Sequence, residues 1–579
     1  MKNWRSIWLV DFEFKAIDGE RPDPICVVAH DLVGGRQIRL WIDPDNPPQC
    51  PYGTGADDLF IAYYASAEIG CHLALGWPVP KRIIDLCIEF KLETCGLQLN
   101  HGRNLLGALL YHKIDESLTG SEKSEMQQLA ARGGPYSGVE KAALIEYCAS
   151  DVCALSRLWK VMSPSIDTPR ALIRGRYMAA LAEVERRGVP LDIASLETLR
   201  KSWPTLKADL IAGIGHGYGV YEGETFVMAK FEQYLTARAI SWPRTPTGRL
   251  NLSDDTFSER SKLYPELQPL KELRATIGRL KLFDLAVGHD GRNRTLLGAF
   301  GSKTGRNQPS NTKFIYGPAT WVRHLIRPEP GTALAYVDYE QQEFGIAAAL
   351  SNDESMWAAY ESGDPYLAFA KMAGAVPSDA TKQSHAAERE RFKVCALAVQ
   401  YGMGASRLAQ SLGLPLAYGR DLMQQHRRTF PKYWDWVEAV GTTAQVSRQL
   451  LTRFGWKLNV TSDTKPTTLA NWPCQANGAE MLRLAVIATV ETGIGVCATV
   501  HDALLVEGSD SEIESTVQRT EELMQEASKV VLGGKVIRTD AKVIRYPERC
   551  HEPRGKALWD TLMRVCPDLS RFGTPTCPN

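Results

Sequence analysis

The segment Ala333–Leu350 constrains the fold of this chain more than any other stretch. It begins with apolar, strand-forming residues that lead directly to Asp338, and apolar residues then continue with helical spacing as far as Ala349. We therefore predict a buried strand, a carboxylate at its end, and a helix. Aspartate at such a turn most often caps a helix, so this segment alone does not define a site.

A second acidic strand end lies far along the chain. Residues 495–506 are apolar on both sides of His501 and Asp502, which predicts two short buried strands that reverse direction at the polar pair. Burying polar groups at a hairpin tip costs free energy unless they are used. If folding brings Asp502 to Asp338, their oxygens would suit Mg²⁺, and a pair of such ions can activate an attacking hydroxyl and stabilise a leaving oxygen. Phosphoryl transfer is the reaction that most needs this arrangement.

Basic and aromatic residues recur on a predicted helix between these two strand ends. Arg389, Lys393, Leu397 and Tyr401 follow one another at intervals of four residues, so they form a single stripe. The cations can meet a triphosphate and the ring can meet a base. A solvated amphipathic helix with incidental charge is the alternative for this segment taken alone.

The composition limits the possible classes of protein. A chain of 579 residues predicts about two to four domains. Its 67 basic and 67 acidic residues cancel, so no overall field attracts nucleic acid, although a cleft can still be locally positive. Its 13 cysteines, without a CxxC pair, favour reduced thiols, and no apolar run reaches the ~18 residues of a membrane span. We expect a cytoplasmic protein without a signal peptide.

Acidic residues also interrupt an apolar strand pattern at residues 6–15. Asp11 and Glu13 are two residues apart and so project from the same face of a strand, which suggests metal ligation. An edge strand with a solvated face is the alternative. In a helical pattern further on, Tyr147 and Asp151 are four residues apart and share a face.

Three motifs resemble motifs A, B and C of family A DNA polymerases, particularly the bacteriophage type. They are Asp-Tyr-x-Gln-x-Glu at 338–343, Arg-x3-Lys-x7-Tyr-Gly at 389–402 and Val-His-Asp at 500–502, in the family's order and spacing. The resemblance implies a right-hand fold with thumb, palm and fingers. It also implies metal ligands in the palm, namely Asp338, Asp502 and a backbone carbonyl near Tyr339.

The same resemblance implies which residues bind nucleotide and DNA. The nucleotide-binding set is Arg389, Lys393, Leu397, Tyr401, Glu343 and Gln341, with Lys393 protonating the leaving pyrophosphate and Glu343 excluding a 2′-hydroxyl. The DNA-binding set is Thr304, Arg306, Asn471, Gln475 and His501, with Arg306 reaching the minor groove near the primer end. Leu397, which replaces a common aromatic, and Ala503, which replaces a glutamate, depart from the family.

The N-terminal motifs resemble the 3′–5′ exonuclease of the DEDDy type, an RNase H-like domain. This resemblance implies that Tyr147 orients the attacking water and that the metal ligands are Asp11, Glu13, Glu68 and Asp151. The middle motif departs from the family's Asn-x3-Asp, because Tyr64 and Glu68 stand at those positions. Asp85 is the competing candidate for the acid.

Together these resemblances predict a multidomain α/β protein. The expected parts are an RNase H-like exonuclease at 1–165, a connector and thumb at 166–300, the palm at 301–360 and 451–579, and the fingers at 361–450. We predict a monomeric, template-directed DNA polymerase that extends primer–template DNA with dNTPs and proofreads from the 3′ end. It would use a pair of Mg²⁺ ions in each active site, with Mn²⁺ as a substitute. The alternatives are a single-subunit RNA polymerase, and a 3′ exonuclease joined to a catalytically silent DNA-binding domain.

Overall fold

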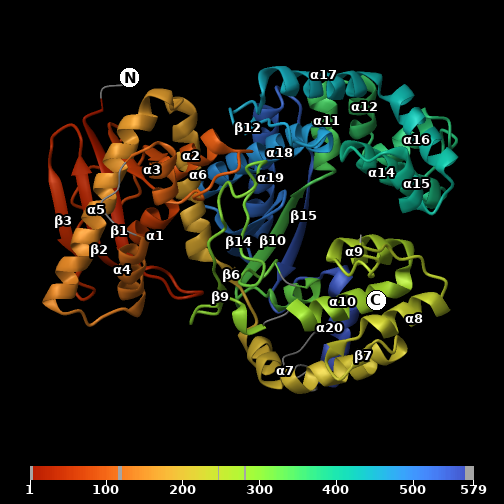
Figure 1. Cartoon of the computed structure of the whole chain (residues 1–579), viewed down its shortest axis with the longest axis horizontal. Coiled ribbons are helices and arrows are strands. Elements are labelled where there is room, and N and C mark those ends of the chain that lie inside the picture. Colours follow the sequence, from red (N-terminus) through yellow and green to blue (C-terminus); the bar gives the residue numbers. More distant parts are fainter. Residues whose placement is uncertain (1–3, 115–119, 246, 280–281, 318, 567–579) are drawn as a thin grey trace.

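The computed structural model describes residues 4–114, 120–245, 247–279, 282–317 and 319–566. Figure 1 shows one sheet with its helices at one end of the molecule, a second sheet at the centre, and two helical lobes beside that second sheet. The predicted multidomain α/β architecture is therefore confirmed. None of the helices in these ranges is long and apolar enough to cross a membrane.

The N-terminal part is a five-stranded mixed sheet with the strand order β3-β2-β1-β4-β5. Its strands are β1 (Ser6–Lys15), β2 (Asp23–Asp31), β3 (Gln37–Trp41), β4 (Asp58–Ala62) and β5 (Ile83–Asp85), and its helices are α1 (Ser66–Ala74), α2 (Leu86–Thr94), α3 (Leu105–Tyr111), α4 (Gly120–Arg132) and α5 (Gly138–Met162). Strand β1 pairs antiparallel with β2 and parallel with β4. Alternate residues of β1 enter different cores: Val10 and Phe12 face one, and Leu9 faces the core to which α5 contributes. Asp11 and Glu13 share the face of Leu9, so they point toward α5.

A long helix, α6 (Thr168–Arg187), joins this part to the rest of the chain. It packs against α1 and β5 and also against α18 (Pro466–Glu491) and β13 (Gly495–Val500) of the central part. Gly175 makes the close contact with β5 possible, because a Cβ there would lie 2.0 Å from the carbonyl oxygen of Ile83. The helix ends at Gly188, whose φ of 68° a glycine adopts without strain.

The central sheet is antiparallel and has the strand order β13-β14-β10-β15. Its other strands are β10 (Thr332–Tyr339), β14 (Ala503–Ser509) and β15 (Thr539–Arg545), and the helices α11 (Gln342–Ser351), α18 and α19 (Ile513–Val531) belong with it. The predicted order of strand, carboxylate and helix is confirmed by β10 and α11. The predicted reversal at His501 and Asp502 is confirmed by β13 and β14.

The helix α18 begins earlier in the chain than its local sequence suggests. The residues around Asn471 predict an irregular start to their helix, but α18 begins at Pro466 and continues through Pro473. Packing of α18 against α11, α17 (Pro431–Ser447) and α19 outweighs the hydrogen bond that Pro473 removes from the helix.

The upper helical lobe in Figure 1 follows α11 in the chain. It contains α12 (Glu354–Glu361), α13 (Pro365–Met372), α14 (Ala386–Gln400), α15 (Ala405–Leu412), α16 (Leu416–Thr429) and α17, and the hairpin of β11 (Gln449–Leu451) and β12 (Lys457–Asn459) follows it. The predicted helix that carries Arg389 and Lys393 is confirmed as α14.

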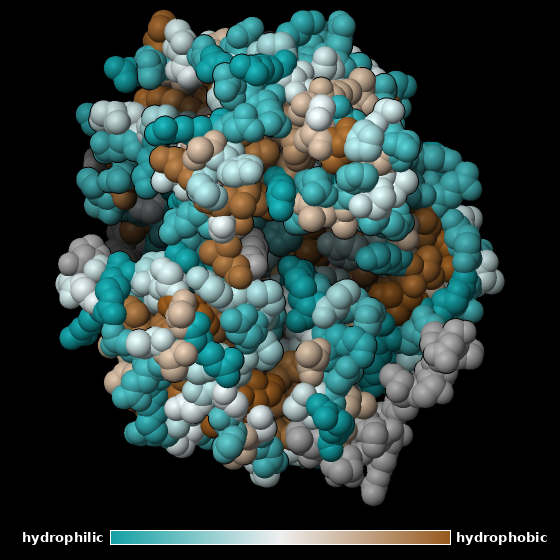
Figure 2. Space-filling view, turned by 90° about the vertical axis from the view of Figure 1, so that its right-hand side faces the viewer, coloured by the Kyte–Doolittle hydropathy of each residue, from teal (hydrophilic) through white to brown (hydrophobic). Residues whose placement is uncertain are grey.

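The lower helical lobe combines segments from the middle and the C-terminal end of the chain. It contains α7 (Ile193–Gly213), α8 (Met228–Ala237), α9 (Asp254–Leu263), α10 (Gln268–Arg279) and α20 (Pro553–Val565), with the short strand pairs β6 (Val189–Pro190) with β9 (Arg292–Asn293) and β7 (Tyr221–Glu222) with β8 (Thr225–Phe226) nearby. The helix α20 packs against α7 and α10, and also against residues Thr320–Leu325. Figure 2 faces the two lobes and shows a hollow between them.

Candidate active sites

The central sheet brings two acidic strand ends together. Asp338 lies opposite Ala503 in the β10–β14 pairing, and Asp502 occupies the turn just before Ala503. His501 makes that turn tight, because it adopts a left-handed φ of 56°. The two aspartates, remote in sequence, therefore meet at one end of the sheet, and their carboxyl groups lie within hydrogen-bond reach of each other.

Burial raises the affinity of this pair for a proton. Removal from water, and then the charge of Asp502, raise the pKa of Asp338 to about 7. Burial also raises the pKa of Asp502, although the nearby Arg306 opposes that effect. The Oδ1 atom of Asp338 is buried and has no hydrogen-bond partner among the described residues. An unpartnered oxygen beside a second carboxylate fits a divalent cation, whose charge would displace the shared proton.

A third carboxylate faces the same end of the sheet. Asp540 on β15 lies directly opposite Asp338, on the other side of β10 from Ala503. Residues directly opposed in an antiparallel pair project from the same face, so the exposed Asp540 side chain lies beside Asp338. Sequence analysis missed this residue, because the pairing of β15 with β10 joins remote segments. The only local signal was an isolated acid within a strand pattern.

Tyr339 contributes no side-chain ligand here. Its ring is buried, and its hydroxyl donates a hydrogen bond of 2.6 Å to the carbonyl oxygen of Met524. That contact anchors the end of β10 to α19. The main chain of Tyr339, rather than its phenol, remains the predicted ligand.

The helix α14 carries its predicted stripe in the upper helical lobe, where it packs against α11 and α13. Arg389 forms an ion pair with Asp364 and lies 5.6 Å from the ring centre of Tyr366. Lys393 lies 3.7 Å from Glu390 of the same helix, and Leu397 is half-buried. Both cations are thus held by carboxylates that a more strongly charged anion can displace.

Tyr401, at the end of α14, joins a cluster that spans the lobe and the sheet. Its hydroxyl donates a hydrogen bond of 3.1 Å to Glu343 of α11, and Arg306 lies 3.7 Å from the same carboxylate. Gln475 of α18 also hydrogen-bonds the Tyr401 hydroxyl. Burial and the charge of Glu343 raise the pKa of Tyr401 to about 12. The structure therefore brings together Arg306, Glu343, Tyr401 and Gln475.

The other residues predicted to contact nucleotide or DNA do not belong to this cluster. Gln341 accepts a hydrogen bond of 3.1 Å from Arg538, and Thr304 lies 2.9 Å from the Ser302 hydroxyl. Asn471 is buried within α18, and only 7% of its surface is exposed, whereas His501 is exposed at the hairpin tip. A cavity of about 470 Å³ lies beside this tip. Residues from four segments of the chain line it, including Tyr177, Arg306, Asn307, Arg483, Thr499 and His501.

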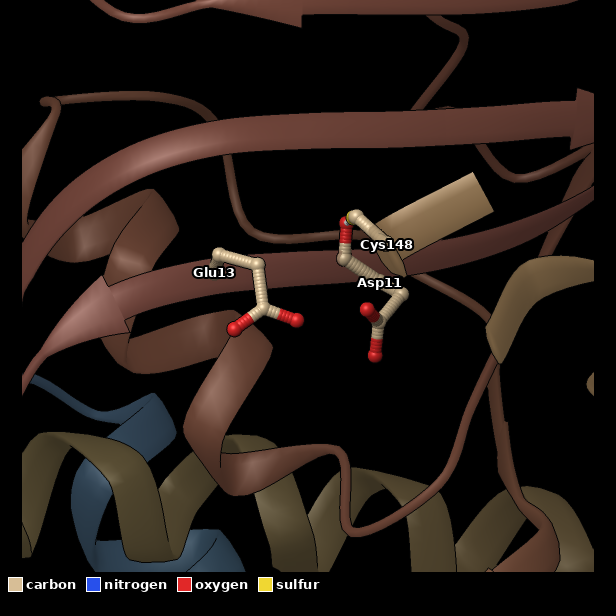
Figure 3. A group of neighbouring side chains, drawn as sticks. All are labelled: Asp11, Glu13 and Cys148. Carbon is tan, nitrogen blue, oxygen red and sulfur yellow. Dashed lines mark hydrogen bonds between the residues drawn. The ribbon is translucent and has the colours of Figure 1, made fainter. Parts of the chain in front are cut away.

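A second acidic cluster lies between β1 and α5. Figure 3 shows the carboxylates of Asp11 and Glu13 projecting from the same side of β1, with Cys148 of α5 beside them. Oxygens of both carboxylates and the Cys148 sulfur lie within 4.8 Å of one another, and the thiol donates a hydrogen bond of 3.1 Å to the Asp11 carbonyl oxygen. Glu68 of α1 is buried close to both acids.

The same cluster includes residues of α4 and α5. Asp151 interacts electrostatically with Asp11 and Glu13, and Tyr147 lies close enough to hydrogen-bond Asp151. Burial, followed by the charge of Asp11, raises the pKa of Glu13 to about 10. Lys123 of α4 forms an ion pair of 3.0 Å with Asp151. Sequence analysis missed Lys123, because nothing in its local pattern distinguishes it from the other charges of a polar helix.

The structure distinguishes Glu68 from Asp85, the two candidates for the acid of the middle exonuclease motif. Asp85 caps α2 and accepts hydrogen bonds from the backbone amides of Tyr64, Ala65, Cys87 and Ile88. Its oxygens are therefore committed to the backbone. Glu68, by contrast, keeps a buried Oε2 without a hydrogen-bond partner in the described part of the chain. It is Glu68 that joins the acidic cluster.

The fold and part of the sequence resemble those of family A DNA polymerases. The model of that family, described as DNA polymerase family A, matches residues 271–542. The chain is 25% identical over 376 residues to the thermostable DNA polymerase I of Thermus aquaticus, a match that covers 60% of this chain and 44% of that protein. It thus spans less than half of that relative.

Two further comparisons cover more of the chain. The DNA polymerase of Mycobacterium phage L5 is 24% identical over 430 residues, which are 72% of this chain and 67% of that protein. The solved structure described as the POL domain of Pol1 from M. smegmatis, in complex with DNA primer-template and dNTP, has a similar fold. Its TM-score is 0.67 at 20% identity, with 94% of this chain and 96% of that one covered.

Proposed function

We propose that this chain is a template-directed DNA polymerase that adds dNTPs to a primer 3′ end. The observation that carries the proposal is the contact between Asp338 and Asp502, with a raised pKa and a buried oxygen that lacks a partner among the described residues. The match of residues 271–542 to the family A model supports the same reaction.

The metal site would use the chain's oxygens in the following way. Asp338, Asp502 and the main-chain carbonyl of Tyr339 would hold a pair of Mg²⁺ or Mn²⁺ ions. When bound, these ions would supply the positive charge that favours ionisation of the primer hydroxyl and stabilises the leaving pyrophosphate. Asp540 would add negative charge at the edge of this site, on the side of β10 away from Ala503.

The helix α14 would receive the triphosphate. Arg389 would exchange its ion pair with Asp364 for a phosphate contact, and Lys393 would give its proton to the leaving pyrophosphate. Glu343, held by Tyr401 and Arg306, would lie beneath the sugar and exclude a 2′-hydroxyl. Leu397 would lie near the sugar and Tyr401 near the template base, with Gln341 at the rim of the nucleotide site.

The primer–template would pass between the two helical lobes. Arg306 and His501 line the cavity beside Asp502, where a primer end would need to lie for attack. Gln475 and Thr304 would add contacts to the strands near this point. Asn471 is buried, so a contact from its side chain would require α18 to shift.

Primer extension with each nucleotide type tests this proposal. The wild-type chain should extend a DNA primer with dNTPs and Mg²⁺, and Asp502→Ala should lose at least about 10²-fold of that rate, because several kcal/mol of charge stabilisation disappear. Equal extension by both proteins would refute the assignment of Asp502. Preferential use of rNTPs would favour an RNA polymerase, and no extension by wild type would favour a silent DNA-binding domain.

We also propose a 3′–5′ exonuclease in the N-terminal part. Its support is the cluster of Asp11, Glu13, Glu68 and Asp151 with Tyr147, on a mixed sheet whose strand order suits an RNase H-like domain. The unpartnered oxygens of Asp11 and Glu68 fit a divalent cation. Tyr147 would orient the water that attacks the terminal phosphodiester.

Digestion of a 3′-labelled single strand tests the nuclease separately. Asp11→Ala should remove digestion while primer extension continues at the wild-type rate, since Asp11 lies outside the central sheet. Digestion that persists in Asp11→Ala would refute this site.

A further inference from the structure

The turn that precedes Arg306 is held by hydrogen-bond donors from remote parts of the chain. The carbonyl oxygen of Lys303 accepts hydrogen bonds from the indole nitrogens of Trp456, at 3.1 Å, and Trp472, at 2.9 Å. The thiol of Cys95, a weak donor at the end of α2, lies 3.2 Å from the same oxygen. Trp456 lies between β11 and β12, Trp472 belongs to α18, and both rings are buried. A carbonyl oxygen has two lone pairs, so the two indoles fix its direction.

The carbonyl of Gly305, two residues later, is held from α18 as well. The guanidinium of Arg483 donates a hydrogen bond of 2.7 Å to this oxygen and lies 4.5 Å from the ring centre of Phe300. Arg483 also forms an ion pair of 3.1 Å with Glu480, and both side chains are buried. Gly305 has a φ of 74°, and a Cβ there would lie 3.2 Å from the ring of Trp456. The turn therefore fits closely against α18 and the β11–β12 hairpin.

The side chain of Arg306 is held much more loosely than its main chain. Its guanidinium lies 3.7 Å from Glu343, which is too far for a hydrogen bond, and 27% of the side chain is exposed. It lines the cavity of about 470 Å³ beside the tip of the β13–β14 hairpin. Because its main chain is fixed, Arg306 reaches a ligand in this cavity from the direction that the turn sets.

Under the proposed function, that ligand is the terminal base pair of the primer. In the minor groove every base pair presents an acceptor at nearly the same place, N3 of a purine or O2 of a pyrimidine. A correctly paired end therefore offers its acceptor at one fixed position, and a mispaired end displaces it. A donor with a fixed direction distinguishes these two ends, whereas a freely moving donor would follow the displaced acceptor.

We propose that Trp456 and Trp472 are positioning residues for Arg306. Their indole N–H groups orient it toward the minor-groove edge of the terminal base pair, and so determine how strictly a mispaired primer end is rejected. The inference rests on the proposed polymerase function. Both indoles are buried and act through the carbonyl of Lys303, so neither would touch DNA. Their loss should change the selectivity of primer extension and not only its rate.

Extension from a modified primer end measures the orientation of Arg306. Every protein would carry Asp11→Ala, so that the proposed nuclease does not remove the end. One primer would end in guanine and the other in 3-deazaguanine, in which a C–H group replaces only the N3 acceptor. The background protein should extend the modified primer at least about tenfold more slowly, the usual effect of losing a hydrogen bond to a charged group. Arg306→Ala should extend both primers at the same slow rate.

Phenylalanine in place of each tryptophan keeps a buried ring but removes the N–H donor. The double variant Trp456→Phe with Trp472→Phe should reduce the difference between the two primers to within about threefold, because extension of the natural end slows. Each single variant should give an intermediate difference. Discrimination against a primer that ends in a mispair should fall in parallel.

Trp77→Phe is the matched control for these variants. The indole of Trp77 also donates to a backbone carbonyl, that of Pro48 at 2.5 Å, but it lies in the N-terminal part of the chain, after α1. This variant should keep the tenfold difference between the primers, since it removes a buried indole hydrogen bond without affecting the turn before Arg306.

The outcomes distinguish a positioning role from a structural one. If the double variant slows both primers equally and keeps their difference, the indoles only support the fold, which overturns the proposal. The single variants decide the same question if melting shows that the double variant does not fold. If Arg306→Ala keeps the difference, Arg306 does not read the primer end, and the inference fails while the polymerase stands. No extension of either primer by the background protein would refute the proposed polymerase and this inference with it.

Discussion

The position of Asp338 suits metal binding but lowers the stability of the metal-free chain. Its carboxyl group is partly removed from water and lies beside Asp502, and its pKa rises to about 7. A carboxyl whose pKa is higher in the folded state binds protons more tightly there than in the unfolded chain. Stability therefore falls as the pH rises from the unfolded pKa to the folded one. Above that range Asp338 is ionised beside Asp502, and a bound cation would offset the repulsion between the two carboxylates.

We predict that Asp338→Asn stabilises the metal-free protein at about pH 8 and does so less at about pH 5, where the native carboxyl is already protonated. Thermal melting in a chelating buffer at both pH values measures this difference. Mg²⁺ should raise the melting temperature of the native chain at the higher pH but have little effect on the variant. An equal shift at both pH values would show that ionisation of Asp338 is not what destabilises the native chain.

At the scale of elements, β10 organises the central site from its position between two partners. Its pairing with β14 brings Asp502 to Asp338, and its pairing with β15 brings Asp540 to the same residue from the other side. Three segments that are remote in sequence thus present carboxylates at one end of one sheet. A shift of either register by one residue would turn these side chains to the opposite face.

We predict that Asp540→Asn raises the Mg²⁺ concentration needed for half-maximal primer extension by roughly three- to tenfold, as expected for ~1 kcal/mol from a nearby, exposed charge. The extension rate at saturating Mg²⁺ should change little. Asp540→Glu keeps the charge and serves as the control. If Asp540→Asn shows the native Mg²⁺ dependence, Asp540 contributes nothing to metal binding.

At the scale of the whole molecule, α6 connects the nuclease sheet to the central part. Arg174 of α6 forms two hydrogen bonds, of 2.6 and 2.7 Å, to Glu89 of α2, and both side chains are buried. The same helix packs on α18 and β13, next to the hairpin that carries Asp502. The two candidate active sites therefore share one structural support.

We predict that Arg174→Met destabilises the protein by roughly 3–5 kcal/mol, because it leaves Glu89 buried without its partner. Urea denaturation of the wild type and the variant would measure this loss. The double variant Arg174→Met with Glu89→Leu should recover much of the loss, since no unpaired charge is then buried. A double variant as unstable as the single one would show that packing, rather than charge, dominates at this position.

Local patterns in the sequence were sufficient for the elements that carry the chemistry. Apolar runs of strand-forming residues identified β1 and β10, and helical spacing identified α14, because these features depend on neighbouring residues. The local pattern did not predict the start of α18, because tertiary packing keeps this helix continuous through Pro473.

What the sequence determined by itself is the set of acidic strand ends and the stripe of cations between them, since each is written within a few consecutive residues. Only the tertiary structure decided which other residues lie beside them. The register of β15 placed Asp540 beside Asp338, the cap of α2 used Asp85 and left Glu68 for the cluster, and the packing of α4 brought Lys123 to Asp151. These relations join remote segments through backbone pairing and burial, and no local pattern encodes them.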